Sequence, residues 1–230
     1  MVRRSFQSLA ELVWPSRCAA CEALGEEPFC RACAGALLEC PPGCPVCGQP
    51  QDEALLPALI PRRCARCSEE PPLVHTARAP YVYWGPLADA IAAFKYRGHE
   101  HLARPLSSLL VATQAPRVDA LVPIPLHSAR LRSRGFDQAL LLARHASDRL
   151  RVPMLEALER VRATRPQVGL SRNDRRANVR GAFTVREKVE GRAVCLIDDV
   201  YTTGATAEAA ALSLLNAGAR RVELRTLARA

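Results

Sequence analysis

The sequence predicts an α/β fold with a doubly wound, mainly parallel sheet, preceded by a small cysteine-rich segment. From residue 73 onward, short apolar runs alternate with helical patterns, which is typical of a parallel sheet with helices on its faces. Before that point lie nine of the ten cysteines, between Cys18 and Cys67. Pro71-Pro72 separates the two regions, so we expect residues 1–72 and 73–230 to form two domains.

The composition is that of a chain that can bury a core, since 49% of its residues are hydrophobic. No stretch approaches the roughly 18 uncharged apolar residues of a membrane-spanning helix, so no membrane insertion is expected. Glu11 interrupts the basic start of the chain before an apolar run can form, which argues against a secretory signal. A cytoplasmic location is therefore expected.

Positive charge is concentrated in the second region. Residues 1–72 carry 7 Lys and Arg against 9 Asp and Glu, whereas residues 73–230 carry 25 against 14. All but Lys95 and Lys188 are arginines, whose guanidinium groups match phosphate oxygens two at a time. The excess favours phosphorylated substrates or a nucleic-acid backbone. A GC-rich genome would explain the ratio of Arg to Lys, but not the excess of positive charge.

Eight cysteines of the first region form four Cys-x-x-Cys pairs. In a cytosolic chain this spacing indicates zinc rather than disulfides, because the turn between two cysteines aims both thiolates at one tetrahedral ion. Two pairs close a structural site of four cysteines, and such a site supplies roughly 10–16 kcal/mol of folding free energy in finger peptides. The expected ligands are Cys18, Cys21, Cys30, Cys33, Cys44, Cys47, Cys64 and Cys67.

The pairing of these motifs has two possible forms. We expect sequential pairing, with the first two motifs on one ion and the last two on another, while an interleaved cross-brace stays open. Cys40 is either a spare thiol or a substitute ligand. A redox Cys-x-x-Cys is disfavoured because it would occur once, beside a βαβ pattern. The sequence leaves open whether this segment binds DNA, another protein or the rest of the chain.

The first elements of the second region are a strand at 79–84 and a helix at 87–95. Leu87, Ala90, Ile91 and Phe94 recur at helical spacing and form its buried face. Lys95 is interpreted either as a helix C-terminal charge or as a phosphate contact. A second helix is expected over 102–114.

A buried strand at 119–125 is followed by a basic loop at 126–136 and a helix to about residue 150. The loop contains His127, Arg130 and Arg134 just before the expected helix start at Gly135 or Asp137. A strand, a basic loop and a helix start fit an anion at the carboxyl edge of a parallel sheet. The alternative is a solvated basic loop. Residues 152–161 are a strand or a short helix.

The polar, arginine-rich segment at 162–181 contains Arg175 and is interpreted as a lid over the site. The alternative is a disordered basic tract. A short strand follows at 182–185, and Gly191 turns the chain into the next strand.

The four apolar residues Val194–Ile197 predict a strand buried on both faces. Asp198 and Asp199 stand at its carboxyl end, followed by a run of small hydroxyl residues around Gly204 and a helix from about Ala205 to Gly218. Backbone N–H groups of such a turn bind phosphate. The two carboxylates accept hydrogen bonds only, so they suit ribose hydroxyls or Mg²⁺. A last strand is expected at 221–227.

These motifs in their order resemble the ComF family of bacterial proteins, which combine a double zinc ribbon with a type I phosphoribosyltransferase domain. The resemblance covers nearly the whole chain. It rests on the four Cys-x-x-Cys pairs, Lys95-Tyr96-Arg97-Gly98, Val122-Pro123-Ile124-Pro125, Arg134-Gly135-Phe136-Asp137-Gln138, the set Arg165, Gln167, Arg175, Asn178, Gly181 and Phe183, and the signature Asp198–Thr206. The family more often has Asn at the position of Asp137.

The resemblance implies a type I phosphoribosyltransferase fold that binds phosphoribosyl pyrophosphate (PRPP) with Mg²⁺. Asp198 and Asp199 would be the catalytic pair that meets the ribose or a Mg²⁺-water shell. His127, Arg130 and Arg134 would face the pyrophosphate, and Arg175 would belong to the flexible loop. The remaining substrate-binding residues would be Val200, Tyr201, Thr202, Thr203, Gly204, Ala205 and Thr206, with the 5′-phosphate at 202–206.

Two functions follow as expectations. The first is a protein that binds PRPP or a related nucleotide and assists the uptake or processing of single-stranded DNA in natural transformation, with a competence helicase as partner. The second is an active Mg²⁺-dependent phosphoribosyltransferase whose acceptor the sequence does not name. A PRPP-sensing regulator would need a DNA-binding element, and no helix-turn-helix is apparent.

Overall fold

The computed structural model describes residues 17–24, 28–51, 62–111, 116–162 and 181–230. Its main sheet contains β1 (Thr76–Arg78), β2 (Tyr81–Val82), β3 (Ala120–Pro123), β6 (Ala193–Tyr201) and β7 (Arg221–Arg229). The strand order is β1-β7-β6-β3, β2 also pairs with β7, and every pairing is parallel. The predicted mainly parallel sheet is confirmed.

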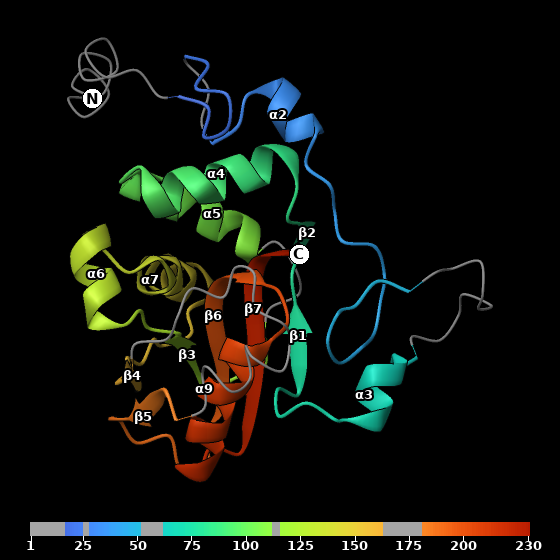
Figure 1. Ribbon diagram of the computed structural model, residues 1–230, viewed down its shortest axis with the longest axis vertical. Helices are drawn as coiled ribbons and strands as arrows, with labels where there is room; N and C mark the ends of the chain where they lie inside the picture. Colours follow the sequence, from blue (N-terminus) through green and yellow to red (C-terminus); the bar gives the residue numbers. More distant parts are fainter. Residues whose placement is uncertain (1–16, 25–27, 52–61, 112–115, 163–180) are drawn as a thin grey trace.

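Helices cover both faces of this sheet (Figure 1). On one face lie α4 (Gly85–Tyr96), α5 (Ala103–Leu110) and α7 (Gln138–Leu150), and on the other lies α9 (Ala205–Asn216). Strand β6 contributes side chains to the apolar cores on both faces of the sheet, because alternate side chains of a strand point to opposite faces. Val194 and Leu196 pack with α9, whereas Cys195 and Ile197 pack with α4, α5 and α7. The four-residue apolar run is therefore buried on both sides, as predicted.

Several elements differ from the expected ones. Strand β6 continues through both acids to Tyr201, and the strand expected at 79–84 is reduced to β2. Helix α5 ends at Leu110, follows a 3₁₀ turn at Glu100–Leu102, and its expected end near residue 114 lies outside the described residues. The segment expected as a loop contains helix α6 (Ser128–Arg134). Its N-terminal cap is His127 and Gly135 ends it in a left-handed conformation.

A second, two-stranded sheet is formed by β4 (Leu158–Arg160) and β5 (Phe183–Val185), which pair antiparallel. This assigns the ambiguous segment at 152–161 to a strand. Residues 163–180, which carry the expected lid, lie outside the described residues. No helix in the described ranges is long and apolar enough to cross a membrane.

The cysteine-rich region contributes two short helices, α2 (Arg31–Gly35) and α3 (Ala65–Glu69), which lie at different places on the sheet domain (Figure 1). Near α2, Ala19 belongs to the apolar core cluster that includes the buried face of α4. Near α3, the backbone N–H of Ala77 in β1 donates to the carbonyl of Val46 at 2.7 Å. The segment thus packs against the rest of the chain in two places.

Candidate functional site

A pocket of about 440 Å³ opens at the carboxyl ends of β3, β6 and β7. This is the edge at which parallel α/β sheets bind ligands. Its lining combines both acids of β6, the loop after them and basic and aromatic side chains from α4, α6 and β4. The lining residues include Tyr83, Lys95, Tyr96, Arg130, Arg134, Arg160, Asp198, Asp199, Val200, Tyr201, Thr202, Gly204, Ala205, Thr206 and Thr226.

The two acids of β6 differ in their partners. Asp199 forms an ion pair with Lys95, at 2.7 Å between Oδ1 and Nζ, and Asp198 accepts the backbone N–H of Asp199 at 2.8 Å. Burial and the neighbouring charge of Asp199 raise the pKa of Asp198 to about 7. Burial opposes the charge on Lys95, but the Asp199 carboxylate outweighs it and raises the pKa of Lys95. One acid is thus neutralised by a lysine, and the other resists ionisation.

Residues 201–206, which run from the last residue of β6 into the first turn of α9, are called the phosphate loop below, after the role that the sequence predicts for them. Gly204 has φ +82° and caps the N-terminus of α9, so the helix begins at Ala205 as predicted. A Cβ at Gly204 would lie 2.8 Å from the Tyr201 hydroxyl, which excludes any larger residue without movement of that ring. The Thr203 hydroxyl is buried and has no hydrogen-bond partner among the described residues. Loop and helix start together present donors to the pocket.

Three arginines, Arg130, Arg134 and Arg160, also line the pocket. Arg134 in α6 stacks on the Tyr96 ring, 5.1 Å from its centroid, and donates to the Gln138 side chain. Burial and the nearby positive charge of Arg130 lower the pKa of Arg160, so the two arginines repel each other. An anion in the pocket would relieve this repulsion.

The predicted site residues are largely brought together. Asp198, Asp199, Arg130, Arg134 and the loop residues except Thr203 line the pocket. His127 instead caps α6, since its Nδ1 accepts the N–H of Ala129 at 3.2 Å. Arg175 lies outside the described residues.

Asp137, which stands where the family more often has Asn, has a structural role. It caps α7 by accepting the N–H of Leu140 at 3.2 Å, and it accepts the N–H of Leu126 at 2.6 Å. The helix after the basic loop is therefore capped by Asp137 and begins at Gln138, whereas Gly135 ends α6. Burial raises the pKa of Asp137.

Sequence reasoning missed the partner of Asp199 and several pocket residues. Lys95 was interpreted as a terminal helix charge or a phosphate contact, but it pairs with Asp199. Tyr83, Tyr96 and Arg160 were given no role. Arg160 had a weak signal, because strand alternation places it on the same buried face as Leu158. Tyr96 stands in the Lys95–Gly98 motif of the family resemblance, whereas nothing local in the sequence marked Tyr83.

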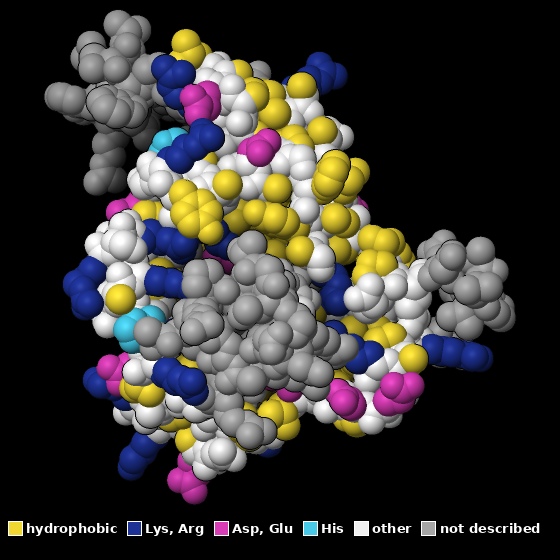
Figure 2. Space-filling view, in the orientation of Figure 1, with side chains coloured by type: hydrophobic (Ala, Val, Ile, Leu, Met, Phe, Trp, Pro, Cys, Tyr) yellow, Lys and Arg dark blue, Asp and Glu magenta, His cyan; other side chains and the backbone are white. Residues whose placement is uncertain are grey.

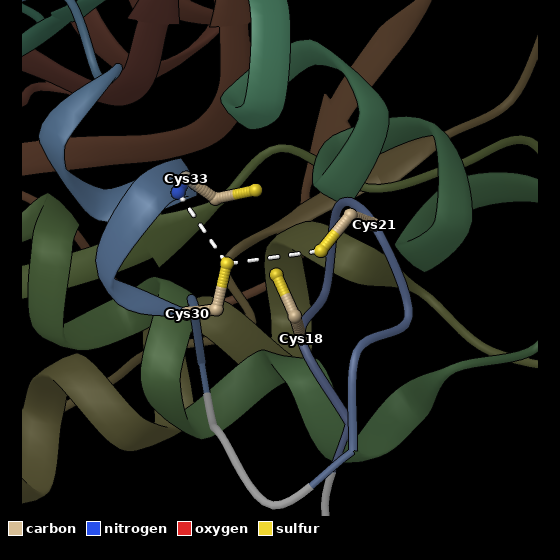
Figure 3. Close-up of side chains that lie close together, drawn as sticks. All are labelled: Cys18, Cys21, Cys30 and Cys33. Atoms are coloured by element: carbon tan, nitrogen blue, oxygen red, sulfur yellow. Dashed lines mark hydrogen bonds between the residues drawn. The ribbon is translucent and has the colours of Figure 1, made fainter.

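The cysteines form two separate groups of four. The first four-cysteine group is Cys18, Cys21, Cys30 and Cys33, and the second is Cys44, Cys47, Cys64 and Cys67. Within each group all sulfur atoms lie within 4.8 Å of one another, and those of the first point toward a common centre (Figure 3). The sequential pairing is confirmed. Cys40 belongs to neither group, and all of these thiols are free of disulfides.

The sulfur spacing fits a bound zinc ion. Four sulfurs at about 2.3 Å from a tetrahedral ion lie about 3.8 Å apart. The distance is 3.7 Å from Cys21 Sγ to Cys30 Sγ and 3.7 Å from Cys47 Sγ to Cys64 Sγ. Both donor sets consist of four thiolates with no open position, which suits structural zinc.

Comparison with known proteins places the chain in a family. It is 34% identical to the DNA utilization protein YhgH of Escherichia coli K12, over 95% of this chain and 99% of that protein. It is 32% identical to competence protein F of Haemophilus influenzae, over 74% and 79%. It is 30% identical to competence protein ComFC of Bacillus subtilis, over 76% and 72%. The chain belongs to the ComF family.

Solved structures add weaker likenesses to this ComF-family chain. The glutamine PRPP amidotransferase from B. subtilis, complexed with ADP and GMP, is 22% identical with a TM-score of 0.40, over 54% of this chain and 26% of that one. TT1426 from Thermus thermophilus is 22% identical with a TM-score of 0.29, over 57% and 73%. No family model matches the chain. The parallel sheet and the two four-cysteine groups agree with the fold expected from the sequence.

Proposed function

We propose that this ComF-family protein binds PRPP or a related nucleotide and assists the uptake or processing of single-stranded DNA. The proposed binding of PRPP or a related nucleotide rests on the pocket. There an acid pair, the phosphate loop and arginines meet at the carboxyl edge of a parallel sheet. The names of its relatives support the proposed role in DNA uptake or processing. A competence helicase is the proposed protein partner, and the cytoplasm the proposed location.

Each part of the ligand has matching residues. The 5′-phosphate would bind the phosphate loop and the N-terminus of α9. Asp198 and Asp199 would accept hydrogen bonds from the ribose hydroxyls, while Arg130 and Arg134 would bind the pyrophosphate. His127 and Arg175 remain proposed ligands of the same pyrophosphate.

The pocket offers Mg²⁺ only part of its coordination. Mg²⁺ prefers six oxygens and usually keeps waters and substrate phosphates. The protein supplies two carboxylates here, and Lys95 already neutralises one of them. The donor set therefore fits a Mg²⁺ ion that arrives with the ligand phosphates, and such an ion would neutralise pyrophosphate charge.

An active phosphoribosyltransferase is the alternative function of the same pocket. The arginines would hold the leaving pyrophosphate, and the walls would keep water away from the reacting carbon of the ribose. Release of pyrophosphate from PRPP in the presence of an acceptor would support it. The acceptor is unnamed, so candidate nucleobases and amines need to be screened.

Binding can be tested by calorimetry with PRPP and Mg²⁺. The wild-type chain is expected to bind, and Asp198→Ala to weaken binding by about tenfold, the effect of losing one hydrogen-bond partner of the ribose. The matched control is Asp148→Ala, which removes an exposed acid of α7 outside the pocket. No heat with PRPP, ribose 5-phosphate or nucleoside monophosphates would contradict the proposal.

An exposed aromatic stripe on α4 favours DNA contact beside the pocket. Trp84, the N-cap of α4, and Tyr96, its last residue, are 68% and 76% exposed, and the partly exposed Ala88 and Ala92 lie between them along the helix. Hydrophobic side chains gather over this region in Figure 2, and Lys and Arg side chains adjoin them. Aromatic rings beside positive charge bind single strands by stacking bases. We propose that a single strand crosses this stripe.

The stripe can be tested with short oligonucleotides. Tyr96→Ala or Trp84→Ala is expected to weaken binding by roughly 5- to 150-fold, the value of one base stack. Leu212→Ala, at an exposed leucine of α9 on the other sheet face, is the control. Unchanged binding in both variants, or an affinity independent of salt, would contradict DNA binding at this surface.

A further inference from the structure

The geometry points to a positioning role for Arg66 and Arg229, which join the second four-cysteine group to the phosphate loop. Metal in that group and a ligand in the pocket would then stabilise each other. The inference rests on the proposed phosphate site and adds that one of the two four-cysteine groups controls its shape. No such link is expected for the first group.

Arg66 connects the metal motif directly to the loop. It lies in α3 between Cys64 and Cys67, in the turn that aims these two thiolates at one ion. Its Nη2 donates to the carbonyl of Thr203 at 3.5 Å, and its guanidinium lies near the Tyr201 side chain. The position of Arg66 depends on the fold of the metal motif, and the loop meets its side chain.

Arg229 makes the second connection. It is paired with Tyr201 across β6 and β7, and its guanidinium lies over the Tyr201 ring, 4.8 Å from the centroid. The same guanidinium donates to the carbonyl of Cys47 at 2.6 Å and to the side chain of Gln49 at 2.7 Å. Arg229 is 6% exposed, so these contacts are shielded from solvent. Arg229 thus contacts both Cys47, an expected metal ligand, and Tyr201 of the phosphate loop.

Tyr201 transmits these contacts into the pocket. Its ring is 5% exposed and lies where a side chain at Gly204 would otherwise stand. A shift of the ring would therefore change the space available to Gly204 and the start of α9. Because Arg229 contacts the ring and Arg66 contacts the backbone of Thr203, the loop conformation depends on the second four-cysteine group.

The first four-cysteine group lies elsewhere. Its segment packs on the α4 side of the sheet, where Glu22 pairs with Arg97 at 2.8 Å in an exposed ion pair. Loss of metal from this group would loosen the contact with α4. The two groups thus allow a comparison within one protein.

The first experiment needs no ligand. Hydrogen exchange is measured at the backbone amides of residues 201–206 in the zinc-loaded full-length chain. Arg66→Ala is expected to speed exchange there by roughly 5- to 150-fold, the usual range for coupled sites, and Arg66→Lys by less. The control is Arg63→Ala, which removes an exposed arginine of the same segment. Equal exchange in Arg66→Ala and Arg63→Ala would overturn the inference.

Exchange in two other elements distinguishes a general loss of stability from a local change in the loop. Exchange in β3 and α7 reports global opening, and it should stay at the wild-type rate in Arg66→Ala. If exchange rises equally throughout the sheet, Arg66 supports the fold rather than the loop, and the positioning role is rejected.

The second experiment uses the reciprocity of linked binding. Zinc release from the full-length chain is followed with a coloured chelator, with and without PRPP and Mg²⁺. The ligand is expected to slow release from one group only. The Cys21→Ser variant, at an exposed ligand of the first group, identifies which one. Arg66→Ala is expected to abolish the slowing.

The outcomes separate this inference from the proposed function. If calorimetry shows PRPP binding in the same sample while both zinc ions leave at unchanged rates, the coupling is wrong and the ligand site stands. If no ligand binds but Arg66→Ala still loosens residues 201–206, the positioning role stands and the proposed ligand is wrong.

Discussion

Lys95 and Asp199 form an ion pair inside the pocket, with side chains that are 17% and 13% exposed. We predict that Lys95→Ala lowers the free energy of unfolding by about 3 kcal/mol, because it leaves an uncompensated carboxylate beside Asp198. Arg97→Ala removes a pair whose side chains are 61% and 53% exposed, so its cost should stay below about 1 kcal/mol. Denaturant unfolding checks both values. Equal losses of unfolding free energy in Lys95→Ala and Arg97→Ala would show that burial does not strengthen the Lys95–Asp199 pair.

The raised pKa of Asp198 predicts a pH dependence of stability. The folded chain keeps this carboxyl protonated up to about pH 7, whereas the unfolded chain loses the proton near pH 4. Between these values the folded state binds more protons, so stability falls as pH rises. Asp198→Asn removes the titration and should raise the free energy of unfolding more at about pH 8 than at about pH 5. A gain that is independent of pH would contradict the assigned pKa.

At the scale of elements, the unit formed by β6, the phosphate loop and α9 was predictable from the sequence. Its strand is a continuous apolar run, and its helix begins after a glycine, so both signals are local. Helix α6 was not predictable in this way, because its seven residues bury no side chain and show no helical period. Strand β1 has three residues and exists through pairing with β7, far along the chain.

Gly204→Ala tests the same unit. The substitution places a methyl group at φ +82° and 2.8 Å from the Tyr201 hydroxyl, so the loop must shift. We expect PRPP binding to weaken at least tenfold, while the thermal midpoint falls by only a few degrees. Gly35→Ala in α2 is the control, since a Cβ there meets no atom within 4 Å. Unchanged binding would show that the loop conformation is not required.

At the scale of the whole molecule, the sequence predicted the cysteine ligands and favoured sequential pairing, but it could not exclude an interleaved arrangement. Four equal Cys-x-x-Cys motifs are compatible with sequential or interleaved sites, and only the three-dimensional arrangement distinguishes them. The same holds for the pocket. Its walls come from residues as far apart as Tyr83 and Thr226, and the contact between Arg66 and Thr203 spans 137 positions. Local periodicity carries no information about such contacts.

Metal removal should affect the whole molecule. The cysteine-rich region has few large apolar side chains, so its order depends on metal binding. A strong chelator is expected to lower the melting temperature and to expose the eight thiols to a thiol reagent. Restoring zinc should reverse both changes, and Mg²⁺, which prefers oxygen ligands, should not. An unchanged melting temperature after complete loss of zinc would contradict this.

The position of β7 between β6 and the pair β1 and β2 has a consequence for biosynthesis. A ribosome makes residues 76–82 long before residues 221–229, yet β7 is the strand of the described main sheet with which β1 and β2 pair. Until β7 emerges, the edge of β6 and the backbone of Cys47 lack their partners. Such long-range parallel pairing forms slowly and leaves strand edges open to aggregation. The nascent chain should therefore depend on chaperones until β7 is made.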